Sequence, residues 1–168
     1  MAAAKDREQA IFAAGCFWGV QYYFDQIPGL VSSLVGYTGG TTEDPTYEEV
    51  CSHTTGHAEA VWLEFDPDKV SYKSLVRHFF RLHDPTQLNR QGPDVGDNYR
   101  SAIFYVTDEQ KTVAEAVMAE AQKTWAEPIV TQLELAGPFY QAGTYHQKYT
   151  ERTGRGMCHV SYEPIPEA

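Results

Sequence analysis

The chain contains 168 residues, of which 42% are hydrophobic and 13% aromatic, and its formal net charge at pH 7 is −10. This length can bury the core of one domain, so we expect residues 1–168 to form a single domain. The negative charge argues against binding to nucleic acid or to an anionic membrane surface, because both would repel the protein. No apolar run reaches the roughly 18 residues of a membrane-spanning helix.

The number of cysteines and the N-terminal segment indicate the cellular compartment in which the protein works. Three cysteines, Cys16, Cys51 and Cys158, are too few and too scattered for a disulfide framework. The first nine residues lack the apolar core of a secretory signal. We therefore expect a cytoplasmic protein in a reducing compartment, while an organellar location after removal of a transit peptide stays open. We also expect a monomer.

Hydrophobic periodicity predicts the order of the elements. Apolar or alternating segments predict β-strands, at 9–14, 31–37, 58–65, 100–107 and 129–136. Apolar residues spaced by about 3.6 predict helices, at 16–27, 72–82 and 108–125, with a short helical turn at 46–50. The segment 86–98 is polar and irregular, and such loops are often functional. Residues 1–8 are expected to be an N-terminal extension, and 137–168 a long C-terminal coil.

This order, β-α-β-β-α-β followed by α-β, predicts the fold class. It is that of a split βαβ unit of the ferredoxin-like type, extended by an additional helix and strand. We therefore expect an α+β fold of two layers, with a mixed sheet and helices mainly on one face.

A cysteine lies where the first strand turns into the first helix, in Gly15-Cys16-Phe17-Trp18-Gly19. At a helix N-terminus, unpaired N–H groups and the positive dipole end can lower a thiol pKa from ~8.5 into roughly 3.5–7.5. The alternative is a small buried hydrophobe at a strand end. No glycine spacing of a nucleotide-binding loop accompanies Cys16, so we do not expect a phosphate site there.

A carboxylate shares the apolar face of the third strand. Glu59 has the same parity as Val61, Leu63 and Phe65, so all four side chains point to one side of the sheet. Burial favours the neutral form of a carboxyl group, and Glu59 could then donate a proton near neutral pH. The alternative is a glutamate at the edge of the core that reaches water or pairs with an arginine.

Further candidates lie in or beside the irregular loops. Tyr47, Asp94 and Tyr99 could together hold a small polar ligand by hydrogen bonds, or could simply shape those loops. Phe17 and Trp18 could form an apolar cradle for a substrate group, or could only pack against the core.

Two more groups contain thiols. Cys51, His53 and His57 offer metal ligands, but their spacing matches no common zinc site, so we expect no metal. Cys158 follows a glycine-flanked stretch, and a cysteine there could approach a distant thiol and resolve its oxidised form.

Four motifs follow one another along the chain: Gly15-Cys16-Phe17-Trp18-Gly19, Gly56-His57-Ala58-Glu59, His83-Asp84-Pro85-Thr86, and Arg90-Gln91-Gly92 with Asp94, Gly96 and Tyr99-Arg100-Ser101. In this order they resemble the peptide methionine sulfoxide reductases of the A class. The resemblance runs from about Ile11 to Tyr149.

The resemblance implies roles for the residues of these motifs. Cys16 matches the nucleophile of the family, and Glu59 matches its proton donor. Tyr47, Tyr99 and Asp94 match the residues that hold the sulfoxide oxygen.

Other positions match less central parts of the family pattern. Phe17 and Trp18 match the aromatic pair that cradles the methyl group, and His146 is expected to border the site. Cys158 stands where the family often carries a resolving cysteine. Cys51 is interpreted as a bystander, although its part in resolution stays open.

The resemblance further implies reduction of methionine S-sulfoxide, free or in proteins, to methionine. Thioredoxin is the expected reductant, and no metal or organic cofactor is implied. One alternative is another thiol oxidoreductase, such as a peroxide-reducing enzyme, which would not need an acid like Glu59. The other is a non-catalytic module that binds oxidised methionine, or a metal through the Cys51 cluster.

Overall fold

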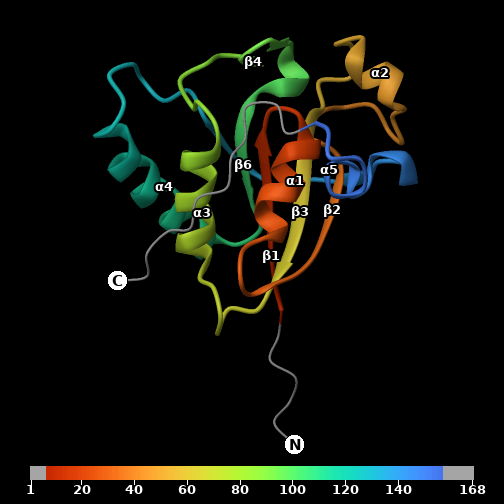
Figure 1. Ribbon diagram of the computed structural model, residues 1–168. Helices are drawn as coiled ribbons and strands as arrows, with labels where there is room; N and C mark the ends of the chain where they lie inside the picture. Colours follow the sequence, from red (N-terminus) through yellow and green to blue (C-terminus); the bar gives the residue numbers. More distant parts are fainter. Residues whose placement is uncertain (1–6, 157–168) are drawn as a thin grey trace, which may run out of the picture.

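The computed structural model describes residues 7–156, and a six-stranded sheet forms its centre (Figure 1). Its strands are β1 (Glu8–Ala14), β2 (Leu30–Thr38), β3 (Ala58–Phe65), β6 (Ser101–Tyr105), β7 (Gln132–Leu135) and β8 (Phe139–Gln141). They lie in the order β7-β6-β1-β3-β2-β8. Neighbours are antiparallel except for β6 and β7, which are parallel.

Helices and short elements complete the described part of the chain. The helices are α1 (Phe17–Asp25), α2 (Tyr47–Cys51), α3 (Tyr72–Leu82), α4 (Asp108–Gln122) and α5 (Tyr149–Thr153). The short elements are a hairpin of β4 (Arg90–Gln91) and β5 (Asp94–Val95), and the 3₁₀ turns η1 (Asp97–Tyr99) and η2 (Thr144–His146). Within residues 7–156, no helix has both the length and the apolar character to cross a membrane.

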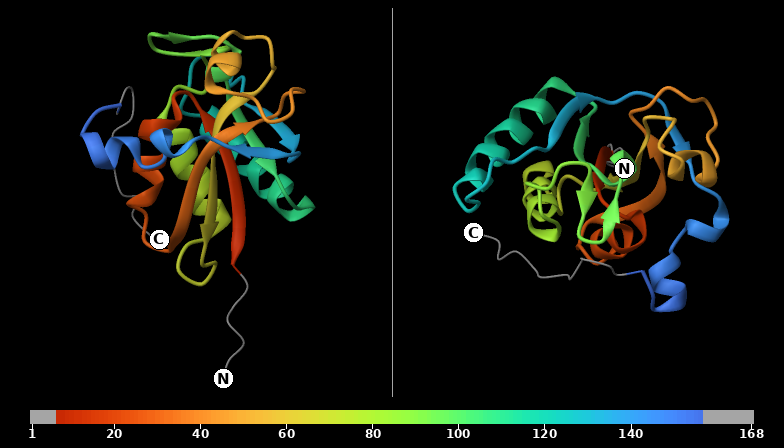
Figure 2. Two further views of the ribbon diagram at one scale, coloured as in Figure 1. Left: turned by 90° about the vertical axis from the view of Figure 1, so that its right-hand side faces the viewer. Right: turned by 90° about the horizontal axis from the view of Figure 1, so that it is seen from above.

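The split βαβ arrangement expected from the sequence is confirmed. The chain runs β1-α1-β2-β3-α3-β6, and these strands lie in the spatial order β6-β1-β3-β2. The additional helix α4 and strand β7 then extend the sheet beside β6. Seen from above in Figure 2, α1 and α3 lie on one side of the sheet, and α4 lies beyond α3, against which it packs.

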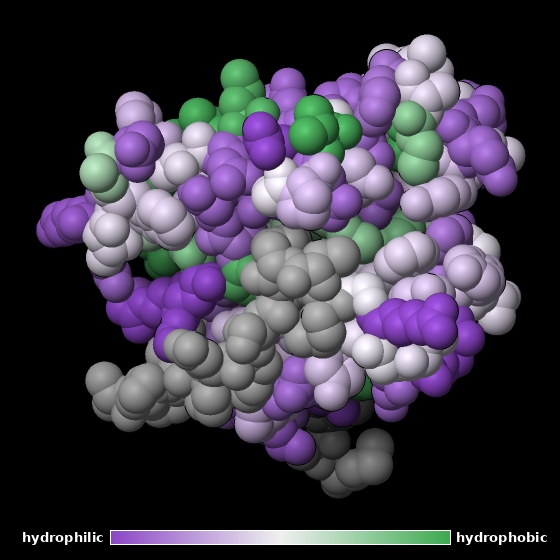
Figure 3. Space-filling view, turned by 45° about the horizontal axis from the view of Figure 1, so that its top comes forward, coloured by the Kyte–Doolittle hydropathy of each residue, from purple (hydrophilic) through white to green (hydrophobic). Residues whose placement is uncertain are grey.

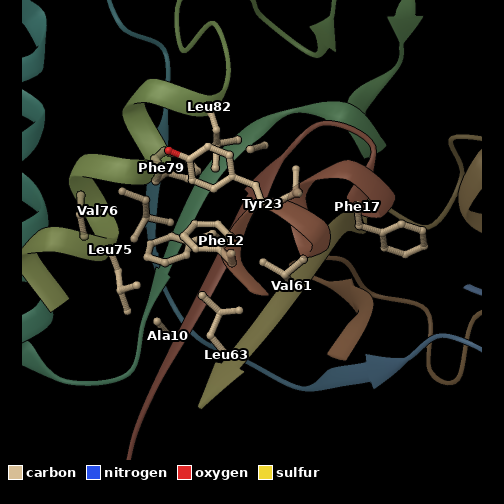
Figure 4. Packing of buried hydrophobic residues seen from close by; sticks show 14 of the residues in the cluster. Ala10, Phe12, Phe17, Tyr23, Val61, Leu63, Leu75, Val76, Phe79 and Leu82 are labelled. Carbon is tan, nitrogen blue, oxygen red and sulfur yellow. The ribbon is translucent and has the colours of Figure 1, made fainter. Parts of the chain in front are cut away.

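The core fills the space between this face of the sheet and the helices (Figure 4). Phe12 of β1 stacks on Phe24 of α1 and on Phe79 of α3, with ring centroids 5.3 Å apart in each pair. Val61 and Leu63 of β3 are fully buried in the same cluster. Since side chains alternate along a strand, this packing determines which face of β3 points inward, and Glu59 lies on that face.

Local signals explain why α3 is the helix whose bounds were predicted most closely. The Ser71 hydroxyl accepts a hydrogen bond from the Ser74 N–H and caps the start of α3. The helix ends at Leu82, before Asp84-Pro85, because the residue that precedes a proline disfavours helical backbone.

Two segments contain more structure than their sequence indicated. The stretch 86–98, expected to be irregular, contains the β4–β5 hairpin and part of η1. The expected coil after Gly137 contains β8, η2 and α5 within its described part. β8 exists because it pairs with the free edge of β2, and a three-residue strand shows no period in sequence.

Candidate active site

The cysteine of the first motif stands at the junction of β1 and α1. Gly15 has φ of +94°, a conformation that glycine adopts without steric cost, and it turns the chain into the helix. Cys16 follows as the N-cap residue of α1 and is 8% exposed. Its thiol therefore lies at the helix end where unpaired N–H groups and the positive dipole end stabilise an anion.

Glu59 is buried beside this junction. Its side chain is 1% exposed, so it does not reach water. Its Oε1 accepts a hydrogen bond from the backbone N–H of Phe17, at 3.3 Å. This N–H belongs to the peptide group that directly follows Cys16. The carboxyl group and the thiol are therefore parts of one site.

Two half-buried tyrosines come to the same place from different elements. Tyr47 is the first residue of α2, which a capping box of Thr46 and Glu49 begins, and Tyr99 ends η1. Burial raises the pKa of both phenols, and the charge of Glu59 is the second cause in each case. Both hydroxyls therefore lie within electrostatic reach of Glu59 and keep their protons as hydrogen-bond donors.

The β4–β5 hairpin brings Asp94 to the site. Asp94 is partly buried, and its charge also raises the pKa of Tyr99, after burial, Glu59 and Cys51. The hairpin is fixed to the end of α3 by the amide of Gln91, which accepts from the Asp84 N–H at 3.0 Å and donates to its carbonyl oxygen at 2.6 Å. The third and fourth sequence motifs are thus joined by these bonds.

His146 connects the aromatic residues of the site. The Trp18 Nε1–H donates to His146 Nδ1 at 3.1 Å. The imidazole ring lies 5.6 Å from the Phe17 ring and 4.5 Å from the Tyr47 ring. Burial lowers the pKa of His146, so the ring is neutral at pH 7 and Nδ1 is an acceptor. The structure thus places His146 against Phe17, Trp18 and Tyr47.

The chain after β8 is anchored by residues that sequence reasoning missed. The Gln147 side chain accepts from the Val35 N–H at 3.0 Å and donates to the Val35 carbonyl oxygen at 2.9 Å, like an added strand residue. Lys148 Nζ lies 2.6 Å from an Asp25 carboxylate oxygen. These bonds join positions more than a hundred residues apart, so no local pattern could have revealed them.

The anchored segment closes over Trp18. The Tyr149 ring stacks on the indole at 3.9 Å. Gly156 is packed so closely that a Cβ there would lie 3.1 Å from the Trp18 ring. Gly156 is the last described residue. Cys158, predicted to resolve Cys16, lies outside the described residues.

The cluster tested as a metal site has other roles. The Gly40 N–H donates to His57 Nδ1 at 3.0 Å, so Nε2 carries the ring proton and donates to the Thr42 carbonyl oxygen at 2.6 Å. His53 Nδ1 lies 3.4 Å from an Asp97 carboxylate oxygen. Among residues 7–156, no three His, Cys, Asp or Glu side chains are grouped to hold a metal ion. The metal-binding alternative therefore has no support there.

Cys51, interpreted from the sequence as a bystander, lies at the end of α2, the helix that begins with Tyr47. A hydrogen bond joins the Tyr47 hydroxyl and the Cys51 sulfur. Burial raises the pKa of the Cys51 thiol, the hydrogen bond opposes this shift, and the charge of Glu59 adds to it. Cys51 is thus a protonated thiol beside a tyrosine of the site.

The site lies at one end of the molecule. Figure 1 shows α2, the β4–β5 hairpin and the start of α1 together at the top of the sheet. Figure 3 views the molecule with this end turned forward, where mostly polar side chains surround a few apolar ones. Leu88 and Val95, beside and within the hairpin, are exposed apolar residues of the described chain.

A thiol at a helix N-terminus, beside a buried carboxyl group and phenol hydroxyls, is an arrangement that could combine a cysteine nucleophile with a general acid. The family model described as peptide methionine sulfoxide reductase matches residues 8–168. The chain therefore belongs to the peptide methionine sulfoxide reductase family, as its motifs indicated.

Individual proteins agree with this assignment. The chain is 54% identical over 153 residues to the peptide methionine sulfoxide reductase MsrA of Geobacter sulfurreducens, a match that covers 90% of this chain and 94% of that protein. It superposes on reduced Mxr1 of Saccharomyces cerevisiae with a TM-score of 0.87 and 30% identity, over 98% of this chain and 96% of the other. For Mxr1 in complex with Trx2, the TM-score is 0.62, with 25% identity, over 89% and 88%.

Proposed function

We propose that the protein reduces methionine S-sulfoxide, free or in proteins, to methionine, with thioredoxin as the electron donor. The observation that carries the proposal is the hydrogen bond from the Phe17 N–H to Glu59, which joins an acid to the peptide group next to the Cys16 thiol. The name of the Geobacter relative agrees with this reaction. A peroxide-reducing activity is not favoured, because such a reaction has no use for a buried acid at this position.

The first step is proton donation to the sulfoxide oxygen. A sulfoxide is a poor electrophile until its oxygen is protonated or strongly hydrogen-bonded. Glu59 gives its proton to that oxygen, while the hydroxyls of Tyr47 and Tyr99 donate hydrogen bonds to it. Asp94 lies near Tyr99 and so belongs to the group of residues that hold the sulfoxide oxygen.

Attack by the thiolate follows. The Cys16 sulfur attacks the protonated sulfoxide and forms a bond to its sulfur. The hydroxyl group then passes from the substrate sulfur to the Cys16 sulfur, as the bonds of the substrate sulfur to oxygen and to Cys16 break. The products are methionine and a sulfenic acid on Cys16. The side chains of Phe17 and Trp18 contact the methyl group of the substrate. His146 packs against both of these side chains.

Cys158 then attacks the sulfenic acid, forming a disulfide with Cys16 and releasing water. Gly156 lies against Trp18, which is two residues from Cys16, and Cys158 is two residues beyond Gly156. Two residues span at most about 7 Å, so this packing supports the pairing. Thioredoxin reduces the disulfide by exchange and leaves both thiols restored. The complex of yeast Mxr1 with Trx2 supports this donor.

We also propose one catalytic domain, a monomer and a cytoplasmic location. The continuous six-stranded sheet supports the single domain. The monomer and the cytoplasmic location are predictions from sequence.

The proposed reaction is tested with the two separated epimers of a methionine sulfoxide peptide, with thioredoxin, its reductase and NADPH. We expect turnover of the S epimer and none of the R epimer, and only slow consumption of hydrogen peroxide in a parallel assay. Equal turnover of both epimers, or peroxide as the best substrate, would contradict the proposal.

A further inference from the structure

Tyr37 is a residue of the site that the motifs did not single out. It lies on β2 directly opposite Glu59 on β3, and opposite residues of paired strands point to the same face of a sheet. The Tyr37 ring lies 5.7 Å from the Phe17 ring. The side chain therefore stands beside the residue that donates the proton and the residue that follows the nucleophile.

The Tyr37 hydroxyl is buried inside the site. The residue is 2% exposed, and its oxygen has no hydrogen-bond partner among residues 7–156. Most buried polar side-chain atoms in proteins are hydrogen-bonded, so an unpaired hydroxyl in a site calls for an explanation. The Tyr37 hydroxyl could donate a hydrogen bond to a neighbouring group that becomes charged during the reaction.

Tyr72 provides a comparison from elsewhere in the core. Its hydroxyl is also buried and has no partner in the described part of the chain, but its ring stacks on Phe12, between the sheet and α3. Burial raises the pKa of both phenols, and for Tyr37 the charge of Glu59 is the second cause, whereas burial alone acts on Tyr72. Of these two hydroxyls, only that of Tyr37 therefore lies near the acid.

After Glu59 has donated its proton, its side chain needs hydrogen-bond donors. The neutral acid becomes a buried carboxylate, and a buried charge is costly unless hydrogen bonds compensate it. The Phe17 N–H is one such donor. The titratable groups that face this region from the packed elements are Cys16 before α1, Tyr47, Glu48 and Cys51 of α2, Tyr99 of η1, and His146 of η2.

We propose that Tyr37 is a positioning residue of the reaction, whose hydroxyl donates a hydrogen bond to the carboxylate that Glu59 becomes when its proton passes to the sulfoxide oxygen. This inference rests on the proposed function. Tyr37 keeps its own proton throughout, and Glu59 recovers a proton from water after methionine has left.

The test compares Tyr37→Phe with Tyr72→Phe as the matched control. Both variants remove one buried hydroxyl and keep the ring, so both should fold. The rate of sulfenic acid formation is measured in a single turnover across a pH series. A hydrogen bond to a charged group corresponds to roughly a 10- to 100-fold change in rate, and we expect this loss in Tyr37→Phe only.

The pH dependence of the rate shows whether the Tyr37 hydroxyl acts on Glu59 or only fills space in the core. A donor to the carboxylate lowers the pKa of Glu59, so removing it should move the limb that reports Glu59 to higher pH. That limb is identified as the one abolished in Glu59→Gln. An unchanged rate, or a slower rate with the limb in place, would overturn the inference while the wild type still reduces the S epimer. A wild type that does not reduce the S epimer would instead overturn the proposed function.

Discussion

Replacing Glu59 with glutamine tests whether the site needs the proton of the carboxyl group or only its hydrogen bond. Glutamine keeps the length of the side chain, and its carbonyl oxygen can accept from the Phe17 N–H as Oε1 of Glu59 does at 3.3 Å. What it cannot do is give a proton to the sulfoxide oxygen. The variant should therefore fold normally and bind substrate, but react slowly.

The expected loss of rate in Glu59→Gln follows from the burial of the carboxyl group away from water. At 1% exposure, water cannot easily replace the carboxyl group as donor. The full contribution of a general acid, roughly 10²–10⁴-fold, should therefore be lost, which corresponds to about 3 to 5 kcal/mol in the barrier.

The assay is a single turnover with the S epimer, which follows methionine release without the reductant. Glu64→Gln is the control, because it removes a carboxylate from the same strand on the opposite face, where it is only partly buried. An unchanged rate in Glu59→Gln, or an equal loss in Glu64→Gln, would refute the role of Glu59 as acid.

The remaining predictions concern the thiols and the core. Cys16→Ser should abolish reduction, as measured by methionine release, and residual turnover at the wild-type rate would exclude Cys16 as the nucleophile. Cys158→Ser should release about one methionine per enzyme with thioredoxin and leave a sulfenic acid that dimedone traps, whereas sustained cycling would point to direct reduction or to Cys51. His78 should make the fold acid-sensitive. Its Nδ1 shares a hydrogen bond with the Tyr23 hydroxyl at 2.7 Å, and burial lowers its pKa from 6.5 to about 4. The unfolded chain therefore binds a proton first, and the free energy of unfolding should fall by about 3 kcal/mol between pH 6.5 and pH 4. Urea titrations across this range, with His78→Gln as the comparison, should show a shallower fall in the variant, and parallel curves would argue against this cause.

The fold was predictable where strong local signals agree with the tertiary packing. The strand 58–65 and the helix 72–82 have the predicted bounds because alternation, a serine cap and a following proline mark them. The parity of Glu59 with Val61 also placed the carboxyl group on the buried face. The hairpin in 86–98 escaped prediction because two-residue strands have no period.

Local patterns along the chain were enough to predict the split βαβ plan, a cysteine at a strand-to-helix junction and an acid on an apolar face, and the motifs indicated the family. Only the tertiary structure brought Tyr37 opposite Glu59, inserted His146 among Phe17, Trp18 and Tyr47, and fixed the segment after β8 onto β2. The reason is the range of the interactions. Periodicity reports neighbours along one element, whereas the bond between Trp18 and His146 joins residues 128 positions apart.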